Sequence, residues 1–420
     1  MTTRTAVCTK AIHQIIPPSK TATNTNMATD NDVAPPQYPS LALAQQLFVL
    51  REPSLQHLHA ETLPVLLDKI NELSAYPLYA ELKSLIGSEW KQSVYDEMKS
   101  KAEAEEKLLD DDAEKAKEQE AEGEEDLRKI EFKRINLVTR IHDFERSRTL
   151  VDAILAAPTT SIPTKLDFSF THLRQALFVA DVALTASTIE STRTLIDQGG
   201  DWDRRNKLKA YEGLFLLSQR QYAQAANLLL DCATTFTSTE LCTYEEIVAW
   251  AVVAAVVSLP RTELKTRVID SPEVLAVLPP THALVTLTQS LYICDYASFF
   301  RALAEAEQSV LLTTRYTRPH ARWYVRELRR RSYAQLLESY RSVSLSHMAA
   351  AFGVSTSYID ADLARFIVGG GLAATIDRVG GTVETKRLDE KNGVYTKLIK
   401  VGDGVLNKLQ RYGAVVEGVE

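Results

Sequence analysis

The sequence predicts a mostly α-helical protein, in which a tetratricopeptide-like helical-repeat solenoid precedes a winged helix with a small β-wing and a C-terminal helix. Three observations lead to this prediction. Gly and Pro are few, at 16 and 15 of 420 residues, which favours helices. Small and large residues alternate in consecutive short helical segments from residue 168 to about 312. The chain then changes to two short helices followed by glycine-flanked β-type segments.

The N-terminal part of the chain divides into a tail and a helical region. We expect residues 1–40 to form a disordered tail, because they are rich in Thr, Asn and Pro and carry few large apolar side chains. Helical periodicity begins at Leu41. Residues 41–165 are therefore predicted to be an N-terminal helical region that includes one charged, solvent-exposed helix over 96–134.

That charged helix accounts for the net charge of the chain. Residues 96–134 hold 16 Asp and Glu against 9 Lys and Arg, an excess of seven acids, and the formal net charge of the whole chain is −7. The remainder is electrically balanced, which gives no general attraction to nucleic acid. We expect this helix to be solvated, with steering of a basic partner as the alternative.

Cysteines and apolar runs exclude several classes of protein. No CxxC pair occurs, which disfavours zinc and disulfide frameworks and favours reduced thiols in the cytoplasm and nucleus. The longest apolar run, 247–259, is too short to span a bilayer, and no signal-peptide core precedes residue 40. Neither a Walker A loop nor a GxGxxG or GxSxG turn is present. We therefore predict no enzymatic activity, no catalytic residue, no metal site, no cofactor and no membrane insertion.

Residues 166–335 are predicted to be the helical-repeat array. Segments 209–217 and 222–230 alternate small with large side chains, and Gly213 is one of the small residues that let two helices approach closely. Helix pairs of this kind bury their apolar faces only by stacking on neighbouring pairs.

Residues 336–390 are predicted to be the winged helix, and 391–420 the C-terminal helix. Segments 345–354 and 358–367 read as a helix-turn-helix, and short strands on either side of 380–381 form the wing. The spacing of six apolar residues points them into the internal core of this unit: Leu345, Met348, Phe352, Ile359, Leu363 and Phe366.

This layout resembles PCI domains, which occur in proteasome lid, signalosome and initiation-factor subunits. Residues 199–213 look like the signature of one family of 26S proteasome lid subunits, regulatory-particle non-ATPase subunit seven, called non-ATPase subunit six in animals. The 26 residues before Met27 and the three glycines at 369–371 depart from that family's pattern. Shorter stretches are also similar to the family: 335–342, 349–354, 364–367, 383–385 and 400–403.

The resemblance implies a structural lid subunit without chemistry of its own, which supports ATP-dependent degradation of ubiquitinated proteins. Its implied partners are other lid subunits, joined laterally through PCI winged helices and through a bundle of C-terminal helices. The N-terminal region is the part expected to meet the base ATPase ring and the core particle. Two alternatives stay open: a PCI subunit of the related signalosome, and an RNA- or DNA-associated PCI scaffold.

If the winged helix and the terminal helix mediate assembly, their apolar and strand-edge groups are the candidate contacts. An edge strand can be completed by a neighbour's strand, and the wing offers Ile376, Val379, Val383 and Thr385. The terminal helix would enter the bundle through Leu398, Val405, Leu406 and Leu409. For both sets, packing within the chain is the alternative.

A stripe of arginines is the third candidate contact surface. The residues that recur at helical spacing beside aromatic rings are Arg318, Arg322 and Arg326. Such a stripe can bind phosphates and stack bases. However, the expected recognition helix carries Asp360 and Asp362, which phosphates repel. We therefore expect the stripe to pair with acids of a neighbouring subunit or helix, or to face water, and nucleic-acid binding is disfavoured.

Overall fold

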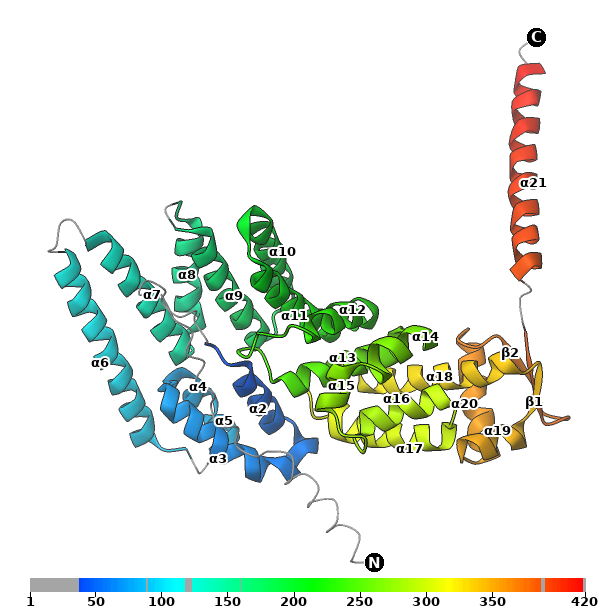
Figure 1. Cartoon of the computed structure of the whole chain (residues 1–420), viewed down its shortest axis with the longest axis horizontal. Coiled ribbons are helices and arrows are strands. Elements are labelled where there is room, and N and C mark those ends of the chain that lie inside the picture. Colours follow the sequence, from blue (N-terminus) through cyan, green and yellow to red (C-terminus); the bar gives the residue numbers. More distant parts are fainter. Residues whose placement is uncertain (1–37, 88–89, 118–122, 159, 387–389, 418–420) are drawn as a thin grey trace, which may run out of the picture. The chain divides into compact units, whose positions relative to one another are not determined.

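A computed structural model describes residues 38–87, 90–117, 123–158, 160–386 and 390–417, most of them in helices (Figure 1). Three short strands form one sheet between residues 342 and 385. The predicted fold is confirmed: mostly helical, with a winged helix that carries a small sheet and is followed by a terminal helix. The expected tail lies outside the described residues as far as residue 37. Among the described residues, no helix is long and apolar enough to cross a membrane.

The first four helices of the described residues build a small core together with Met98, which belongs to the next long helix. The first of them begins at Leu41, as predicted, and the four are α2 (Leu41–Arg51), α3 (Gln56–Leu73), α4 (Tyr76–Glu81) and α5 (Lys83–Ile86). Leu43, Leu66 and Ile70 are buried in this core because they recur at helical spacing on facing sides of α2 and α3.

The charged segment forms two helices, so the prediction of one helix over 96–134 is wrong. Helices α6 (Gln92–Lys117) and α7 (Gly123–Ile141) pack side by side (Figure 1). Arg134 pairs with Asp110 and Arg140 pairs with Glu105, a pattern that requires the two helices to run antiparallel. The hairpin is favoured because it neutralises these acids and buries Leu137 and Ala102 between the helices.

Each helix between residues 144 and 258 packs on the next one along the chain, and two later helices, over 283–293 and 296–306, also pack on each other. A close crossing joins α11 and α12 at Gly213, where a Cβ would lie 2.7 Å from Leu229 Cδ2. Only glycine allows this approach, so the predicted role of Gly213 is confirmed. The helices of the array are α8 (Phe144–Ala156), α9 (Ile162–Val179), α10 (Val182–Gly199), α11 (Trp202–Ser218), α12 (Tyr222–Ala233), α13 (Tyr244–Ser258), α14 (Arg261–Leu264), α15 (Pro272–Val277), α16 (Ala283–Ile293) and α17 (Tyr296–Ala306).

Helix α18 (Ala321–Ser339) belongs to both the array and the winged helix. Its Tyr324 hydroxyl donates to the Val253 carbonyl of α13 at 2.9 Å, while Tyr333 is buried in the winged-helix core. The elements that follow are β1 (Ser342–Ser344), α19 (Leu345–Phe352), α20 (Thr356–Val368), β2 (Ala374–Asp377), β3 (Thr382–Thr385) and α21 (Glu390–Glu417).

The helix-turn-helix forms for local reasons. Gly353 ends α19 at φ +66°, and the Ser355 hydroxyl accepts from the Tyr358 amide to cap α20. Five of the six predicted core residues are buried, and Leu345 is half-buried. The sheet has the order β1-β3-β2 and is antiparallel. Strand β1 was not predicted, because three residues are too few to show alternation.

Candidate assembly surfaces

The wing places its four candidate residues in different environments. Val379 lies in the turn between β2 and β3 and is fully exposed, and Ile376 is half-buried on the edge strand β2. Val383 is buried, at 0% exposure, in the winged-helix core. The Thr385 hydroxyl donates to the Tyr340 carbonyl of the same chain at 3.0 Å.

The candidates on β3 therefore need correction. With only two strands, β3 would be an edge strand, but β1 pairs with its other side and makes it the centre of the sheet. Its backbone groups and the Val383 side chain are thus already used within the chain. The unpaired strand edges belong to β1 and β2, so the wing can add a neighbour's strand only there.

Helix α21 exposes its apolar side chains along most of its length. Leu398, Val405, Leu406 and Leu409 are between 51% and 66% exposed. Tyr395 and Tyr412, which sequence analysis did not assign to the contact surface, are exposed too. The series 395, 398, 402, 405, 409 and 412 alternates spacings of three and four residues, which places it on one face with Gly402 in its middle. We call this face the α21 stripe. An exposed apolar face of this kind is typical of a surface that packs on another chain.

The three arginines do not act as one stripe. Arg318 precedes α18 and donates to Glu52 at 2.7 Å and to the Leu312 carbonyl at 2.9 Å, so its partners lie within the chain. Arg322 and Arg326 are exposed on α18.

The aromatic rings beside these arginines are occupied. Trp323 stacks on Tyr222 at a centroid distance of 5.5 Å, and the Arg220 guanidinium lies over its ring. Tyr324 and Tyr333 are buried. A platform for stacking nucleic-acid bases requires exposed rings, so Arg322 and Arg326 remain as a pair of exposed cations only.

A buried carboxylate joins α18 to α20. Asp362 accepts from the Tyr333 hydroxyl at 3.1 Å and from Arg329 Nη1 at 3.2 Å. Burial and the Asp362 charge raise the pKa of Tyr333, which therefore stays protonated and able to donate. Two residues earlier, Asp360 forms an ion pair with Arg378 of the wing at 3.0 Å. The expectation that both acids repel phosphates therefore fails for Asp362, whose side chain faces the protein.

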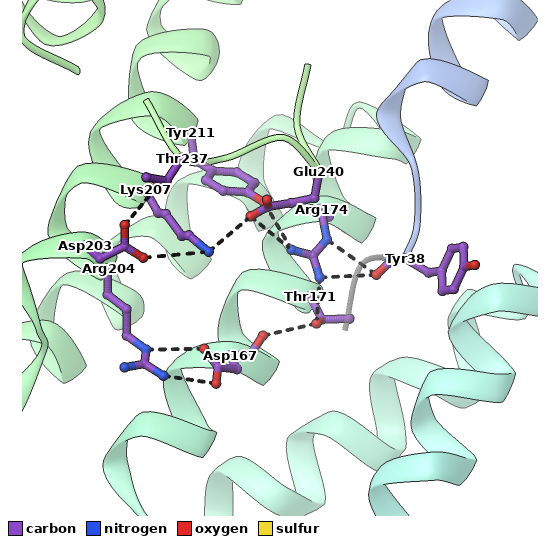
Figure 2. Close-up of polar contacts among 10 residues, drawn as sticks. All are labelled: Tyr38, Asp167, Thr171, Arg174, Asp203, Arg204, Lys207, Tyr211, Thr237 and Glu240. Carbon is purple, nitrogen blue, oxygen red and sulfur yellow. Dashed lines mark hydrogen bonds and ion pairs between the residues drawn. The ribbon is translucent and has the colours of Figure 1, made fainter. Parts of the chain in front are cut away.

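The stretch 199–213 comprises the last residue of α10, the turn after it and most of α11, and its polar side chains fix α11 to other segments (Figure 2). The Arg204 guanidinium donates to both carboxylate oxygens of Asp167 on α9, at 3.2 and 3.1 Å. Lys207 lies 3.9 Å from Asp203 and 3.8 Å from Glu240, which belongs to the segment between α12 and α13.

At the centre of Figure 2, the buried Arg174 of α9 connects this network to the start of the described chain. Its guanidinium donates to the Tyr211 hydroxyl at 3.1 Å and to the Thr171 hydroxyl at 3.0 Å. It also donates to the Tyr38 carbonyl at 3.4 and 3.3 Å, so residue 38, predicted to lie in the tail, is anchored. These bonds, with the Glu240 carboxylate at 3.9 Å, satisfy the buried charge of Arg174.

No group of three or more His, Cys, Asp or Glu side chains that could hold a metal ion occurs in the part of the chain that the structure describes. What the fold presents instead is an array of helices, a winged helix with free strand edges, and an apolar terminal helix. This combination defines a protein of the PCI class.

Comparisons with known proteins give the particular family. Three family descriptions match successive parts of the chain: 26S proteasome subunit RPN7 over residues 91–267, PCI domain over 296–387, and the RPN7/PSMD6 C-terminal helix over 395–416. The chain is 42% identical to the 26S proteasome regulatory subunit rpn7 of Schizosaccharomyces pombe, over 90% of this chain and 96% of that protein.

Two further relatives agree. The 26S proteasome non-ATPase regulatory subunit 6 homolog of Arabidopsis thaliana is 37% identical over 91% of this chain and 98% of its own length. RPN7 of Saccharomyces cerevisiae is 43% identical over 77% and 76%. The chain belongs to the RPN7 family of 26S proteasome regulatory subunits.

Proposed function

We propose that this chain is a structural, non-catalytic subunit of the lid of the 26S proteasome regulatory particle, and that it acts in the cytoplasm and nucleus. The observation that carries the proposal is similarity over nearly the whole chain to proteins named as 26S proteasome regulatory subunits. The α21 stripe supports it, because an apolar helix face exposed to water gains stability by packing on other chains. The subunit thus supports degradation of ubiquitinated proteins through assembly.

Besides Arg322 and Arg326 of α18, which would face acids of a neighbouring subunit, the proposed contacts fall in three regions of the chain. The exposed edges of β1 and β2, with Ile376 and Val379, would pair laterally with a neighbouring lid subunit. The α21 stripe would enter a bundle of C-terminal helices. The N-terminal helices would face the base ATPase ring and the core particle.

Purification of the tagged full-length chain from its own cells, followed by identification of the co-purifying chains, tests the proposal. We expect lid subunits to co-purify in stoichiometric amounts, together with base ATPase subunits. Recovery of signalosome subunits in their place would contradict it and would favour the paralogous complex.

Reversing the two exposed arginine charges tests the proposed acidic neighbour. We expect Arg322→Glu with Arg326→Glu to weaken binding to the neighbouring subunit about ten-fold at low salt, because two favourable charge contacts become repulsive. Salt titration of binding by surface plasmon resonance measures the effect, which added salt should reduce.

The control replaces two exposed cations elsewhere on the array, Lys265→Glu with Arg301→Glu, and should leave binding unchanged. Tight binding of single-stranded RNA by the unmodified chain, lost in the Arg322/Arg326 variant and kept in the control, would support the nucleic-acid alternative and contradict the acidic neighbour.

A further inference from the structure

The first turn of α11 exposes a large aromatic side chain that none of the proposed contacts uses. Trp202 begins α11 with 62% of its surface exposed, although tryptophan is mostly buried in folded proteins. The polar network that holds α11 in place does not include it (Figure 2). Its ring stacks on no other ring among the described residues. An exposed tryptophan of this kind is typical of a residue that anchors a protein interface.

The segment between α12 and α13 runs beside this turn. The Thr237 hydroxyl donates to the Asp203 carboxylate at 2.7 Å, and the Asn206 side-chain amide donates to the Thr235 hydroxyl at 2.8 Å. Trp202 lies one helical turn before Asn206 on the same side of α11, so it borders this segment. The start of α11 and the segment therefore form one continuous surface.

Two more aromatic residues lie at this surface. Phe236 stacks on Tyr244, the first residue of α13, at a centroid distance of 6.2 Å. Phe236 is half-buried and Tyr244 is 37% exposed, so a partner can reach both. We call Trp202, Phe236 and Tyr244 the aromatic edge. Three aromatic residues in one surface offer a large apolar contact area.

Acidic groups flank the aromatic edge on its α13 side. Burial and the charge of Glu273 raise the pKa of Tyr244, so Glu273 lies near this hydroxyl. A hydrogen bond from the Ser271 hydroxyl lowers the pKa of Glu273, which is therefore charged at neutral pH. Glu245 follows Tyr244 and is exposed. Neither glutamate has an ion-pair partner among the described residues, so two negative charges near Tyr244 are uncompensated.

The cations of the surface do not balance its acids. Two of the three cations at the start of α11 are paired with acids of the same chain, and the third, Arg205, is exposed. Residues 201–207, 235–246 and 272–275 together hold six acids and three cations, a net charge of −3. Such a surface attracts a cationic partner and repels the phosphates of nucleic acid.

We propose that the aromatic edge binds an arginine-bearing segment of a partner protein, with a guanidinium over the Tyr244 ring beside Glu273 and an adjoining apolar side chain on Trp202. Arginine fits better than lysine, because its planar guanidinium stacks on an aromatic ring while it donates two hydrogen bonds to a carboxylate. The partner is a protein because the chain belongs to a family of subunits of a large assembly. In this respect the inference rests on the proposed function, but it does not depend on the contacts proposed for the wing, α18 or α21.

Ligand-observed NMR on the full-length chain tests the site with two probes, the peptide N-acetyl-Leu-Arg-Leu-amide and the same peptide with citrulline in place of arginine. Citrulline keeps the shape of arginine but carries no charge. We expect the arginine peptide to bind with a dissociation constant in the millimolar range, and the citrulline peptide to bind about five-fold more weakly. Equal binding of the two peptides, or binding of neither, would overturn the proposal. Such a result would leave the assignment to the lid unaffected, because the isolated chain is measured.

Two matched variants locate the binding. Trp202→Ala should weaken binding of the arginine peptide about five-fold, because it removes the apolar contact of the aromatic edge. Tyr395→Ala is the control, because Tyr395 of α21 is also 62% exposed and lies outside the aromatic edge. If both variants bind the peptide as the unmodified chain does, the aromatic edge is not the binding site.

Neutralising the two glutamates separates this site from the general negative charge of the chain. Glu245→Gln with Glu273→Gln should remove most of the preference for arginine over citrulline, because the guanidinium loses the charges that it faces. Glu263→Gln with Glu305→Gln removes two exposed acids elsewhere on the array and should keep the preference. An equal loss in the two double variants would indicate nonspecific attraction and would contradict the proposal.

A photo-crosslinking residue at position 202 of the assembled particle identifies the occupant. We expect a crosslinked partner peptide that contains arginine. A crosslinked peptide without arginine, or no crosslinked peptide at all, would reject the proposed partner.

Discussion

Replacing Leu398 and Leu409 together by serine is expected to prevent the chain from entering the regulatory particle while leaving its own fold intact. Both side chains are exposed on one face of α21, so the isolated chain loses no core packing. If the α21 stripe is buried in a helical bundle, loss of two leucines removes about 4 kcal/mol of binding free energy, or about a thousand-fold in affinity.

Native mass spectrometry of the reconstituted lid measures incorporation. The matched control is Lys400→Ser with Arg411→Ser, which changes two exposed residues at the same spacing on another face of the helix and should assemble normally. Deletion of residues 395–420 should reproduce the double-leucine phenotype. Normal incorporation of either the leucine variant or the deletion would show that α21 does not mediate assembly.

Replacing Asp362 by alanine is expected to destabilise the winged helix strongly. The change leaves the buried Tyr333 hydroxyl and the Arg329 guanidinium without their shared acceptor. Loss of this acceptor lowers the free energy of unfolding by about 3 kcal/mol. Amide hydrogen exchange in α20 should then become about a hundred-fold faster, because the free energy of local opening falls by about 3 kcal/mol.

Asp360→Ala is the control for this measurement. Its partner Arg378 is mostly exposed, and an ion pair in water contributes less than about 1 kcal/mol. Amides of α13, in the array, should exchange at unchanged rates in both variants. An acceleration in α20 no larger for Asp362→Ala than for Asp360→Ala would contradict a structural role for the buried carboxylate.

Local signals in the sequence were sufficient for much of the fold. The start of α2 at Leu41, the closure of α19 by Gly353 and the cap at Ser355 each depend on neighbours within a few residues. The two helices of the charged segment were missed because the favourable pairing of Arg140 with Glu105 joins residues 35 positions apart. Charge patterns within one helix cannot reveal such a contact.

Among the candidate surfaces, too, local patterns indicate some features, while others depend on contacts between residues far apart in the sequence. Exposure of the α21 stripe follows a local apolar pattern, and sequence analysis named three of its residues, Leu398, Val405 and Leu409, as apolar positions of one helix. The position of Val383 at the centre of the sheet depends on β1, which becomes a strand only by pairing with β3. Arg318 meets Glu52, which lies 266 residues earlier, and nothing in the spacing of the arginines indicates that partner.

The bond between Arg174 and the carbonyl of Tyr38 has a consequence for how the family can diverge. A main-chain oxygen is supplied by every amino acid, so many substitutions at position 38 preserve this acceptor. Arg174 has no such freedom, because no other side chain offers its fork of donors. Position 38 can therefore vary in sequence while the hydrogen bond to Arg174 is kept, whereas position 174 cannot.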